Sequence, residues 1–102
     1  MDRHVLAWAA GFFDGEGWAG AVRHGSRPKR DPRAQINQGG EGAVPEVLLR
    51  YHRAVGAVGH LGGPSRQPGR KDLYRWTASS RRDVERTWLR LRPWLGAAKS
   101  VE

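Results

Sequence analysis

The chain has 102 residues, contains no cysteine, and carries 18 Lys and Arg residues against 10 Asp and Glu residues, a formal net charge of +8. This length predicts one domain over residues 1–102, and the absence of cysteine excludes a disulfide framework or a thiolate zinc site. The apolar run from Val5 to Phe13 is too short to cross a bilayer, which takes about 20 residues, and no secretory cleavage site follows it. We therefore expect an intracellular, cytoplasmic and nucleoid-associated protein with no membrane partner.

The positive charge is the first indication of a partner. Each phosphate that a basic side chain neutralises releases counterions and adds affinity for a polyanion, so nucleic acid is the favoured partner. Two alternatives remain at this point: a high-GC genome, which enriches arginine in its proteins, and a protein that binds a membrane surface. Net charge is an argument about partners and not about fold.

The first expected element is a helix over residues 3–13 with Asp2 as its N-cap. This segment is apolar on nearly every face, which is typical of a helix that is covered on two sides. Small residues recur three or four positions apart and therefore share a stripe along which another backbone could come close. A central helix within a monomer is the alternative to a helix at a dimer interface. The stripe consists of Ala7, Ala10, Gly11 and Gly15.

The following segments alternate between strand patterns and helix patterns, with basic, Gly- and Pro-containing loops between the paired strands. Pro45 and Gly56 have the composition of a helix start and a helix cap, and Ser80 to Asp83 resembles a capping box. The expected elements are strands over 18–23, 33–38, 58–61 and 73–78, a helix over 45–55, and a helix after Ser80 that Pro93 ends or kinks.

The second expected strand has two chemically different sides. Ala34 and Ile36 alternate with Arg33, Gln35 and Asn37, which gives one apolar side and one side of amides and a guanidinium. These polar residue types bond base edges bidentately in the major groove. Any solvated strand also has a polar side, so the pattern by itself is a weak indication.

Two acids, Asp14 and Glu16, stand among glycines after the apolar run. The C-terminal end of a helix is the less favourable end for carboxylates, so stability does not call for them. The flanking glycines permit a left-handed or strained backbone and a close approach of another chain. A carboxylate here could bind Mg²⁺, which prefers oxygen ligands, and a two-fold axis through the helix would bring two acids together. An ordinary turn after a helix is the alternative.

Residues 9–17, AAGFFDGEG, resemble the nine-residue signature of the LAGLIDADG homing endonucleases. Residues 33–38, RAQINQ, resemble the second strand of that family, and Pro93, Trp94 and Leu95 followed by Lys99 resemble its ending. The resemblance covers nearly the whole chain. It implies an α+β fold of order αββαββα, with a four-stranded antiparallel sheet and helices on one face.

The resemblance also implies an activity, which is sequence-specific cleavage of double-stranded DNA by an Mg²⁺-dependent homodimer. On this basis Glu16 binds the metal and is catalytic, Gly15 belongs to the metal site, Gln38 positions the water network, and Lys99 stabilises developing phosphate charge. Asp14 fixes the end of the helix. The dimer interface is expected at Ala7, Ala10, Gly11 and Asp14.

The basic loops and the polar strand faces supply the residues expected to contact DNA. A solvated surface is the alternative for the loop residues. Of the five tryptophans, Trp8, Trp76, Trp88 and Trp94 are expected in the core, whereas the place of Trp18 is open. The expected DNA contacts are Arg23, Arg27, Lys29, Arg30, Arg33, Gln35, Asn37, Arg66, Arg70, Lys71 and Arg75.

Two other functions remain open on the sequence. One is a catalytically inactive DNA-binding protein derived from the family, against which the retained Glu16 argues. The other is an RNA-binding splicing cofactor, because a basic sheet face does not distinguish duplex DNA from structured RNA. The target sequence and any association with an intron or an intein are not readable from the chain.

Overall fold

The computed structural model describes residues 3–23 and 30–95, which form three helices and a four-stranded sheet. The predicted αββαββα order is confirmed, and the fold is α+β. The elements are α1 (Arg3–Glu16), β1 (Gly17–Arg23), β2 (Arg30–Gly40), α2 (Glu46–Ala54), β3 (His60–Ser65), β4 (Asp72–Ala78), α3 (Arg81–Leu91) and a short 3₁₀ helix, η1 (Arg92–Trp94).

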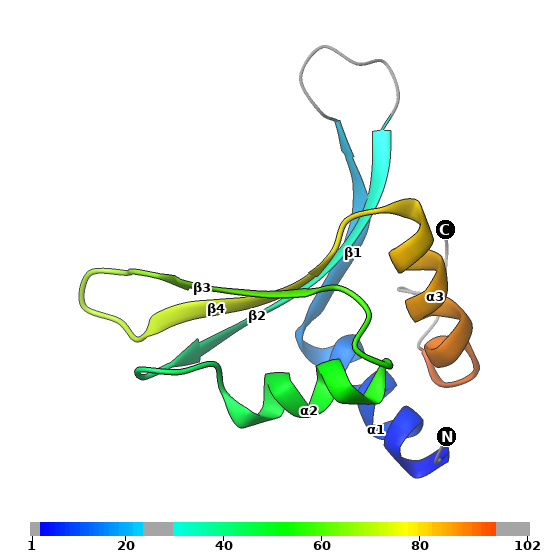
Figure 1. The fold of residues 1–102 in the computed structure, drawn as a ribbon, viewed down its shortest axis with the longest axis horizontal. Helices are drawn as coiled ribbons and strands as arrows, with labels where there is room; N and C mark the ends of the chain where they lie inside the picture. The colour runs from blue at the N-terminus through cyan, green and yellow to red at the C-terminus, as the bar shows by residue number, and fades with distance from the viewer. Residues whose placement is uncertain (1–2, 24–29, 96–102) are drawn as a thin grey trace.

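All neighbouring strands of the sheet are antiparallel, in the order β1-β2-β4-β3. The three helices gather on one side of the sheet, as predicted, while the β1–β2 and β3–β4 hairpins diverge from each other (Figure 1). β2 pairs with β4 only between Ala34 and Gly40, and its pairing with β1 covers residues 30–36. The sheet is therefore four-stranded only around residues 34–36 of β2; one arm consists of β1 and the start of β2, and the other of β3, β4 and the end of β2.

The length of β2 exceeds the prediction because the strand runs through Pro32. Proline cannot donate a ladder hydrogen bond and is confined to edge strands or strand ends. Pro32 pairs with Ala21 of β1 and lies beyond Ala34, where pairing with β4 stops. At that point β2 is itself an edge, so the proline is compatible with the strand.

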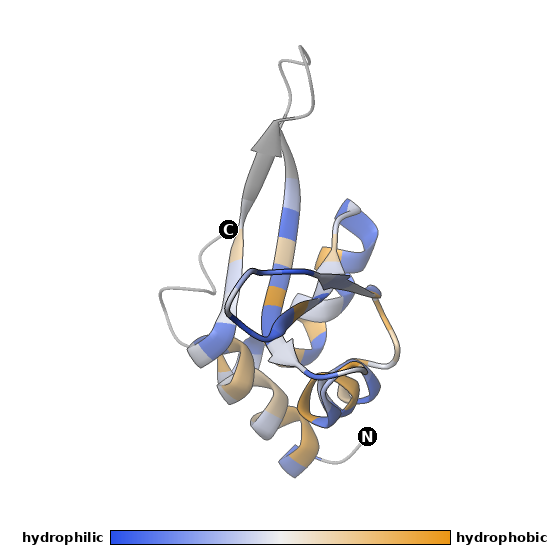
Figure 2. Cartoon of the chain, turned by 90° about the vertical axis from the view of Figure 1, so that its left-hand side faces the viewer, coloured by the Kyte–Doolittle hydropathy of each residue, from blue (hydrophilic) through white to orange (hydrophobic). Residues whose placement is uncertain are grey.

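The side of the sheet that faces the helices is closely packed. Ala34 and Ile36 of β2 and Trp76 and Ala78 of β4 have no exposed surface. Successive side chains of a strand alternate between faces, and Figure 2 shows this alternation as hydrophobic and hydrophilic bands along the strands. The opposite side, which we call the outer face, carries Trp18, Gly20, Arg33, Gln35, Asn37, Gly39, His60, Gly62, Ser65, Leu73, Arg75 and Thr77.

An aromatic cluster forms the centre of the core between the sheet and the helices. Trp76 lies edge-on to Tyr51 of α2 at a centroid distance of 4.8 Å, and Phe13 of α1 lies edge-on to Trp88 of α3 at 5.3 Å. The Trp76 indole donates a hydrogen bond to the carbonyl of Val58 at 2.9 Å. Tilted and edge-to-face pairs at these separations stabilise a core beyond the area that they bury. All three helices are thereby fixed against β4.

Helix α1 continues through Glu16, three residues further than predicted. The end of the helix is set at Gly17, where a Cβ atom would lie 2.7 Å from the Phe13 carbonyl oxygen and 2.6 Å from the Phe13 ring. The glycines around the acids would permit a left-handed conformation, but neither Gly15 nor Gly17 adopts one. The positive-φ glycines of the described residues lie elsewhere in the chain, at 42, 56, 59, 63 and 69.

The ends of α2 and α3 agree with the capping residues predicted. Gly56 follows α2 with a φ of +76°, a conformation that favours glycine. At the start of α3, the Ser80 hydroxyl accepts a hydrogen bond from the Asp83 amide at 3.0 Å, and η1 follows α3 at Pro93. Both helices therefore begin and end where the sequence indicates.

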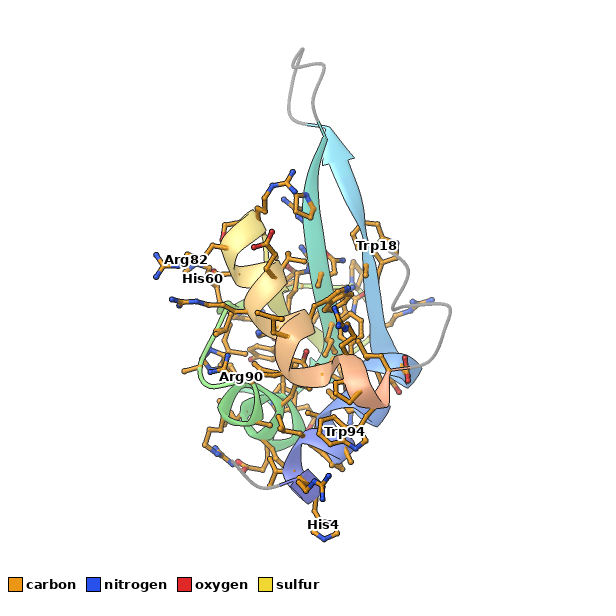
Figure 3. The ribbon with its side chains drawn as sticks, turned by 90° about the vertical axis from the view of Figure 1, so that its right-hand side faces the viewer. His4, Trp18, His60, Arg82, Arg90 and Trp94 are labelled. Carbon is orange, nitrogen blue, oxygen red and sulfur yellow. The ribbon has the colours of Figure 1, made fainter. Side chains whose placement is uncertain are left out.

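Two predictions at the edges of the fold were wrong. β3 begins at His60 and not at residue 58, because Val58 is buried under Trp76 and Gly59 turns the chain with a φ of +88°. Trp94 is not a core residue, since 36% of its surface is exposed. It lies in η1 beside α1 (Figure 3). No helix in residues 3–23 and 30–95 is long and apolar enough to cross a membrane.

Candidate nucleic-acid interface and active site

The outer face of the sheet consists of rows of side chains that cross the strands. One row, Trp18–Gln35–Thr77–His60, passes through all four strands, because each pair of neighbours is opposed in the register. The next row contains Asn37, Arg75 and Gly62. Every side chain in these two rows is exposed or half-buried. No helix covers this side of the sheet (Figure 1), so the outer face presents a broad, polar, basic surface.

The central strands hold two of the predicted DNA-contacting residues in a fixed relation. The Arg75 Nε atom donates a hydrogen bond to the Asn37 Oδ1 atom at 2.8 Å, and both side chains are exposed. Since this bond uses the Asn37 carbonyl oxygen and one guanidinium N–H, the Asn37 amide N–H groups and the outer guanidinium nitrogens are directed elsewhere. Arg33 and Gln35 also lie on the outer face, as predicted.

Other predicted contacts lie at the ends of the two arms. Arg66, Arg70 and Lys71 are exposed in the connection between β3 and β4, where the Gln67 amide donates to the Lys71 carbonyl at 3.0 Å. Arg70 and Lys71 line a hollow together with the acids Glu41 and Asp72. In the other arm the described backbone pairs Arg23 with Arg30. Arg27, Lys29 and the catalytic candidate Lys99 lie outside the described residues.

Glu16 is the last residue of α1 and is exposed. Two residues later the chain has entered β1, and Trp18 lies on the outer face. Gly15 occupies the last turn of the same helix, where backbone carbonyls have no hydrogen-bond donor within the helix. Gly15 and Glu16 are therefore both exposed at the point where the motif segment meets the sheet.

The Glu16 carboxylate and the Gly15 carbonyl are the type of ligand that Mg²⁺ binds, but two residues are too few to complete its coordination. Mg²⁺ prefers hard oxygen ligands and is often held by one or two carboxylates together with substrate phosphates. Within the described part of the chain, no three acidic or histidine residues are grouped closely enough to hold a metal ion. A site of this kind needs additional oxygen ligands from a second copy of the chain or from a phosphate.

Gln38 lies on the same side of β2 as Ile36, the side that faces the helices. Ile36 pairs with Gly17, the first residue of β1, so Gln38 is located two residues further toward the end of α1. It is half-buried and opposes the buried Tyr74. Gln38 therefore follows by two residues the pair that joins β2 to the end of α1, and it is not part of the outer face.

The fold of the chain is similar to those of solved homing endonucleases. The chain matches the homing endonuclease I-CvuI in complex with its target in the presence of calcium (TM-score 0.71, 19% identity, 93% of this chain). It also matches the LAGLIDADG meganuclease I-CpaMI bound to uncleaved DNA (TM-score 0.71, 17% identity, 97% of this chain). A third match is the LAGLIDADG homing endonuclease I-GzeII in complex with its DNA target (TM-score 0.68, 14% identity, 93% of this chain).

The chain has the LAGLIDADG homing-endonuclease fold. No protein-family model and no curated protein matches its sequence, so the likeness is one of structure at low sequence identity. The chain spans 60% of the length of I-CvuI and about a third of I-CpaMI and I-GzeII, of which it covers 32% and 31%.

In this LAGLIDADG fold, α1 leaves one strip uncovered by the chain's own core. Gly11 and Gly15 are exposed, and a Cβ atom at either position would meet nothing within 4 Å. Ala7 is half-buried beside them. We call His4, Ala7, Gly11 and Gly15 the α1 strip; their spacing of three or four residues aligns them on one helical side.

Two of the residues expected in the dimer interface lie differently. Ala10 has no exposed surface, because it packs into the core with Ala9 and Phe13. Its side chain therefore offers no exposed surface to a second chain, unlike Ala7, Gly11 and Gly15. Asp14 is half-buried in the last turn of α1.

The sequence did not identify three members of the row that crosses the outer face. Thr77 lies between Gln35 and His60 in the register, and Trp18 pairs with Gln35 and has 46% of its surface exposed. Only the strand register shows that these side chains share a surface with the amides of β2. Histidine, threonine and tryptophan in isolation are too common in cores and on solvated strands to have signalled it.

Proposed function

We propose that this protein is a sequence-specific, metal-dependent endonuclease that cleaves double-stranded DNA as a homodimer. The observation that carries the proposal is the position of the exposed Glu16 at the point where the motif helix meets an uncovered sheet face lined with Arg33, Gln35, Asn37 and Arg75. One element thus presents a carboxylate suited to phosphodiester chemistry beside a surface suited to reading DNA.

Recognition is assigned to the outer face. The major groove, about 12 Å wide, admits β-structure, and its base edges offer distinct donor and acceptor patterns. Gln35 is of the residue type that bonds adenine bidentately, and Arg33 and Arg75 are of the type that bonds guanine. The basic residues of the β3–β4 connection would contact phosphates, which adds affinity without sequence information.

Cleavage is assigned to Glu16, with Gln38 and Lys99 in supporting roles. A bound divalent ion would activate water and stabilise the leaving oxygen. The Glu16 carboxylate and the Gly15 carbonyl would hold that ion against a scissile phosphate. Gln38, at the end of β2 nearest to α1, would orient water by its amide, and Lys99 would stabilise negative charge on the phosphate.

The homodimer follows from the number of acids and from the α1 strip. One described chain contributes a single exposed carboxylate at this site, and metal-assisted cleavage of two strands requires one such site for each strand. The absence of side chains at Gly11 and Gly15 would let two α1 helices pack closely about a two-fold axis. Such packing would bring the two Glu16 residues together, and the DNA site would be nearly palindromic.

The proposal is tested by incubating the protein with a randomised duplex DNA library and Mg²⁺ and sequencing the new DNA ends. We expect cleavage at related, nearly palindromic sites, and loss of cleavage in Glu16→Gln, which keeps the size of the side chain but removes the charge. Chelation of the metal should have the same effect as the substitution.

Other outcomes would identify the alternative functions. Selective binding to duplex DNA without cleavage in the wild type would identify an inactive DNA-binding protein. Selective binding to structured RNA with no preference for any duplex DNA would contradict the endonuclease and support an RNA-binding cofactor.

A further inference from the structure

Trp18 is an exception on the outer face, because it is an exposed aromatic ring on a surface where the half-buried Leu73 is the other large apolar side chain among the described residues. Trp18 is 46% exposed, and its neighbours across the row are Gln35, Thr77 and His60. Aromatic side chains stabilise a protein mainly by burial, so folding alone does not favour an indole here. Trp94 and Leu89 are also exposed, but both belong to the helix layer.

The indole of Trp18 lies along β1 over the backbone of Gly20. A Cβ atom at position 20 would be 2.7 Å from Cζ2 and 3.0 Å from Cη2 of the ring, which is closer than any real contact. Glycine at position 20 therefore makes room for the ring in this orientation. Figure 3 shows Trp18 beside β1 and away from α3. The chain thus holds a flat apolar surface on the outer face.

The indole is poorly suited to reading hydrogen-bonding groups of bases, since its only polar group is one N–H donor. The one apolar group that a base presents in the major groove is the C5-methyl group of thymine. Trp18 stands next to Gln35 in the row. If Gln35 binds an adenine, Trp18 is placed to contact the methyl group of a thymine on the adjoining base pair.

We propose that Trp18 is a specificity-determining residue that recognises the C5-methyl group of a thymine close to the cleavage site. This inference rests on the proposed function, because it places the outer face in the major groove of duplex DNA. Removal of one methyl group from an apolar contact should weaken binding about fourfold, and about 15-fold for the two half-sites of a dimer.

The test uses a randomised duplex library amplified in two forms, one with dTTP and one with dUTP, which lacks only the methyl group. Binding is selected in Ca²⁺, and the enriched sequences are read for the wild type and for Trp18→Ala. From the dTTP library the wild type should enrich thymine at one position of each half-site. This enrichment should be absent from the dUTP library and absent for Trp18→Ala in both libraries.

Three further variants test whether the thymine preference depends on the position of the Trp18 indole. Gly20→Ala keeps the tryptophan at position 18, but the added Cβ atom displaces its indole. This variant should reduce the thymine enrichment. Arg75→Ala should lose enrichment at a different position and keep the thymine preference. Leu89→Ala, at the most exposed apolar residue of α3 (73%), should behave as the wild type. Thermal unfolding of each variant confirms that it is folded.

Each result either supports or overturns the inference. If the wild type enriches a site but Trp18→Ala retains the same thymine preference, or if uracil serves as well as thymine, the role of Trp18 is overturned and the endonuclease proposal stands. If the wild type enriches no duplex sequence in either library, both proposals fall.

Discussion

The outer face of the sheet and the α1 strip are both uncovered surfaces, but they are built in opposite ways. The outer face carries two arginines, two amides and an exposed tryptophan, whereas the α1 strip, apart from the exposed His4 at its start, exposes two glycines beside the half-buried Ala7. A surface with many directed donors is suited to a partner with a defined chemical pattern. A surface without side chains is suited to close backbone packing, where shape decides the contact.

The two surfaces meet at the end of α1. Glu16 follows the α1 strip by one residue and precedes the outer-face residue Trp18 by two. Under the proposed function, the difference between them separates self-association from DNA recognition within one short segment, with the acid at the boundary. Variants on each side should affect one property and not the other, and this separation can be tested.

The largest effect is expected for Glu16→Gln. We expect the cleavage rate at saturating Mg²⁺ to fall on the order of a thousandfold, because loss of the carboxylate removes a metal ligand whose ion stabilises the transition state by several kcal/mol. DNA affinity and dimerisation should remain within a few-fold of the wild type. Single-turnover cleavage, DNA titration and sedimentation measure the three properties. Unchanged cleavage would remove Glu16 from the active site.

Gly11→Leu should separate dimerisation from folding. The space around Gly11 is open in the single chain, so a leucine fits the monomer and should stabilise α1 by about 0.5–1 kcal/mol through helix propensity. The same side chain would prevent close packing of two helices, so sedimentation should give a monomer.

The matched control for Gly11→Leu is Gly62→Leu, at another open glycine located on the outer face. This variant should remain dimeric and bind DNA less well. Association of Gly11→Leu with wild-type affinity would refute the close-packed interface.

Arg75→Ala tests whether the outer face binds DNA and reads its bases. We expect a loss of about 1–3 kcal/mol in DNA binding and relaxed preference at one position of each half-site. Because Arg75 donates to Asn37 at 2.8 Å, the effects of Arg75→Ala and Asn37→Ala should not be additive. A double-mutant cycle on the selected DNA measures the coupling. Additive losses would mean that the pair does not act as a unit on DNA.

The smallest effect is expected in the layer between the two surfaces, at Tyr51. Its hydroxyl is buried and has no hydrogen-bond partner among the described residues. Tyr51→Phe should therefore increase the free energy of unfolding by about 1 kcal/mol and change neither dimerisation nor DNA binding. Denaturant unfolding measures this change, and a destabilised variant would indicate that the hydroxyl has a partner.

The same residue predicts a pH dependence of stability. Burial raises the pKa of Tyr51 far above its ordinary value of 10.0. The unfolded chain therefore releases this proton above pH 10 while the folded chain keeps it. The contribution of the neutral phenol to stability is complete below pH 10 and is lost as the pH rises above it. Tyr51→Phe should reduce that alkaline loss.

Two features were predictable from the sequence because they depend on local patterns. They are the order of the elements and the side of β2 that packs on the helices. Ala34 and Ile36 alternate with polar residues, so the side of β2 that packs on the helices is determined without knowledge of its neighbours. The hydroxyl of Ser80 and the position of Gly56 similarly mark the ends of helices through bonds and backbone angles within a few residues.

The remaining features depend on contacts between distant residues. In β1 both sides are small or apolar, so the alternation does not indicate that Trp18 points outward, and only its pairing with Gln35 determines this. The end of α1 depends on the approach of Gly17 to Phe13 within the packed core. Ala10 was assigned to the dimer stripe because spacing alone does not distinguish the two sides of a helix that is apolar all round.

The division of the sheet beyond Ala34 has a consequence for how recognition can change. Beyond Ala34, β2 pairs with β1 and not with β4, so residues 30–33 of β2 and their partners in β1 form an arm apart from β3 and β4 (Figure 1). Substitutions at these positions should combine independently with substitutions in β3, whereas Asn37 and Arg75 stay coupled. The fold is therefore suited to modular evolution, in which each half of a binding surface is exchanged while the acidic centre and the core stay constant.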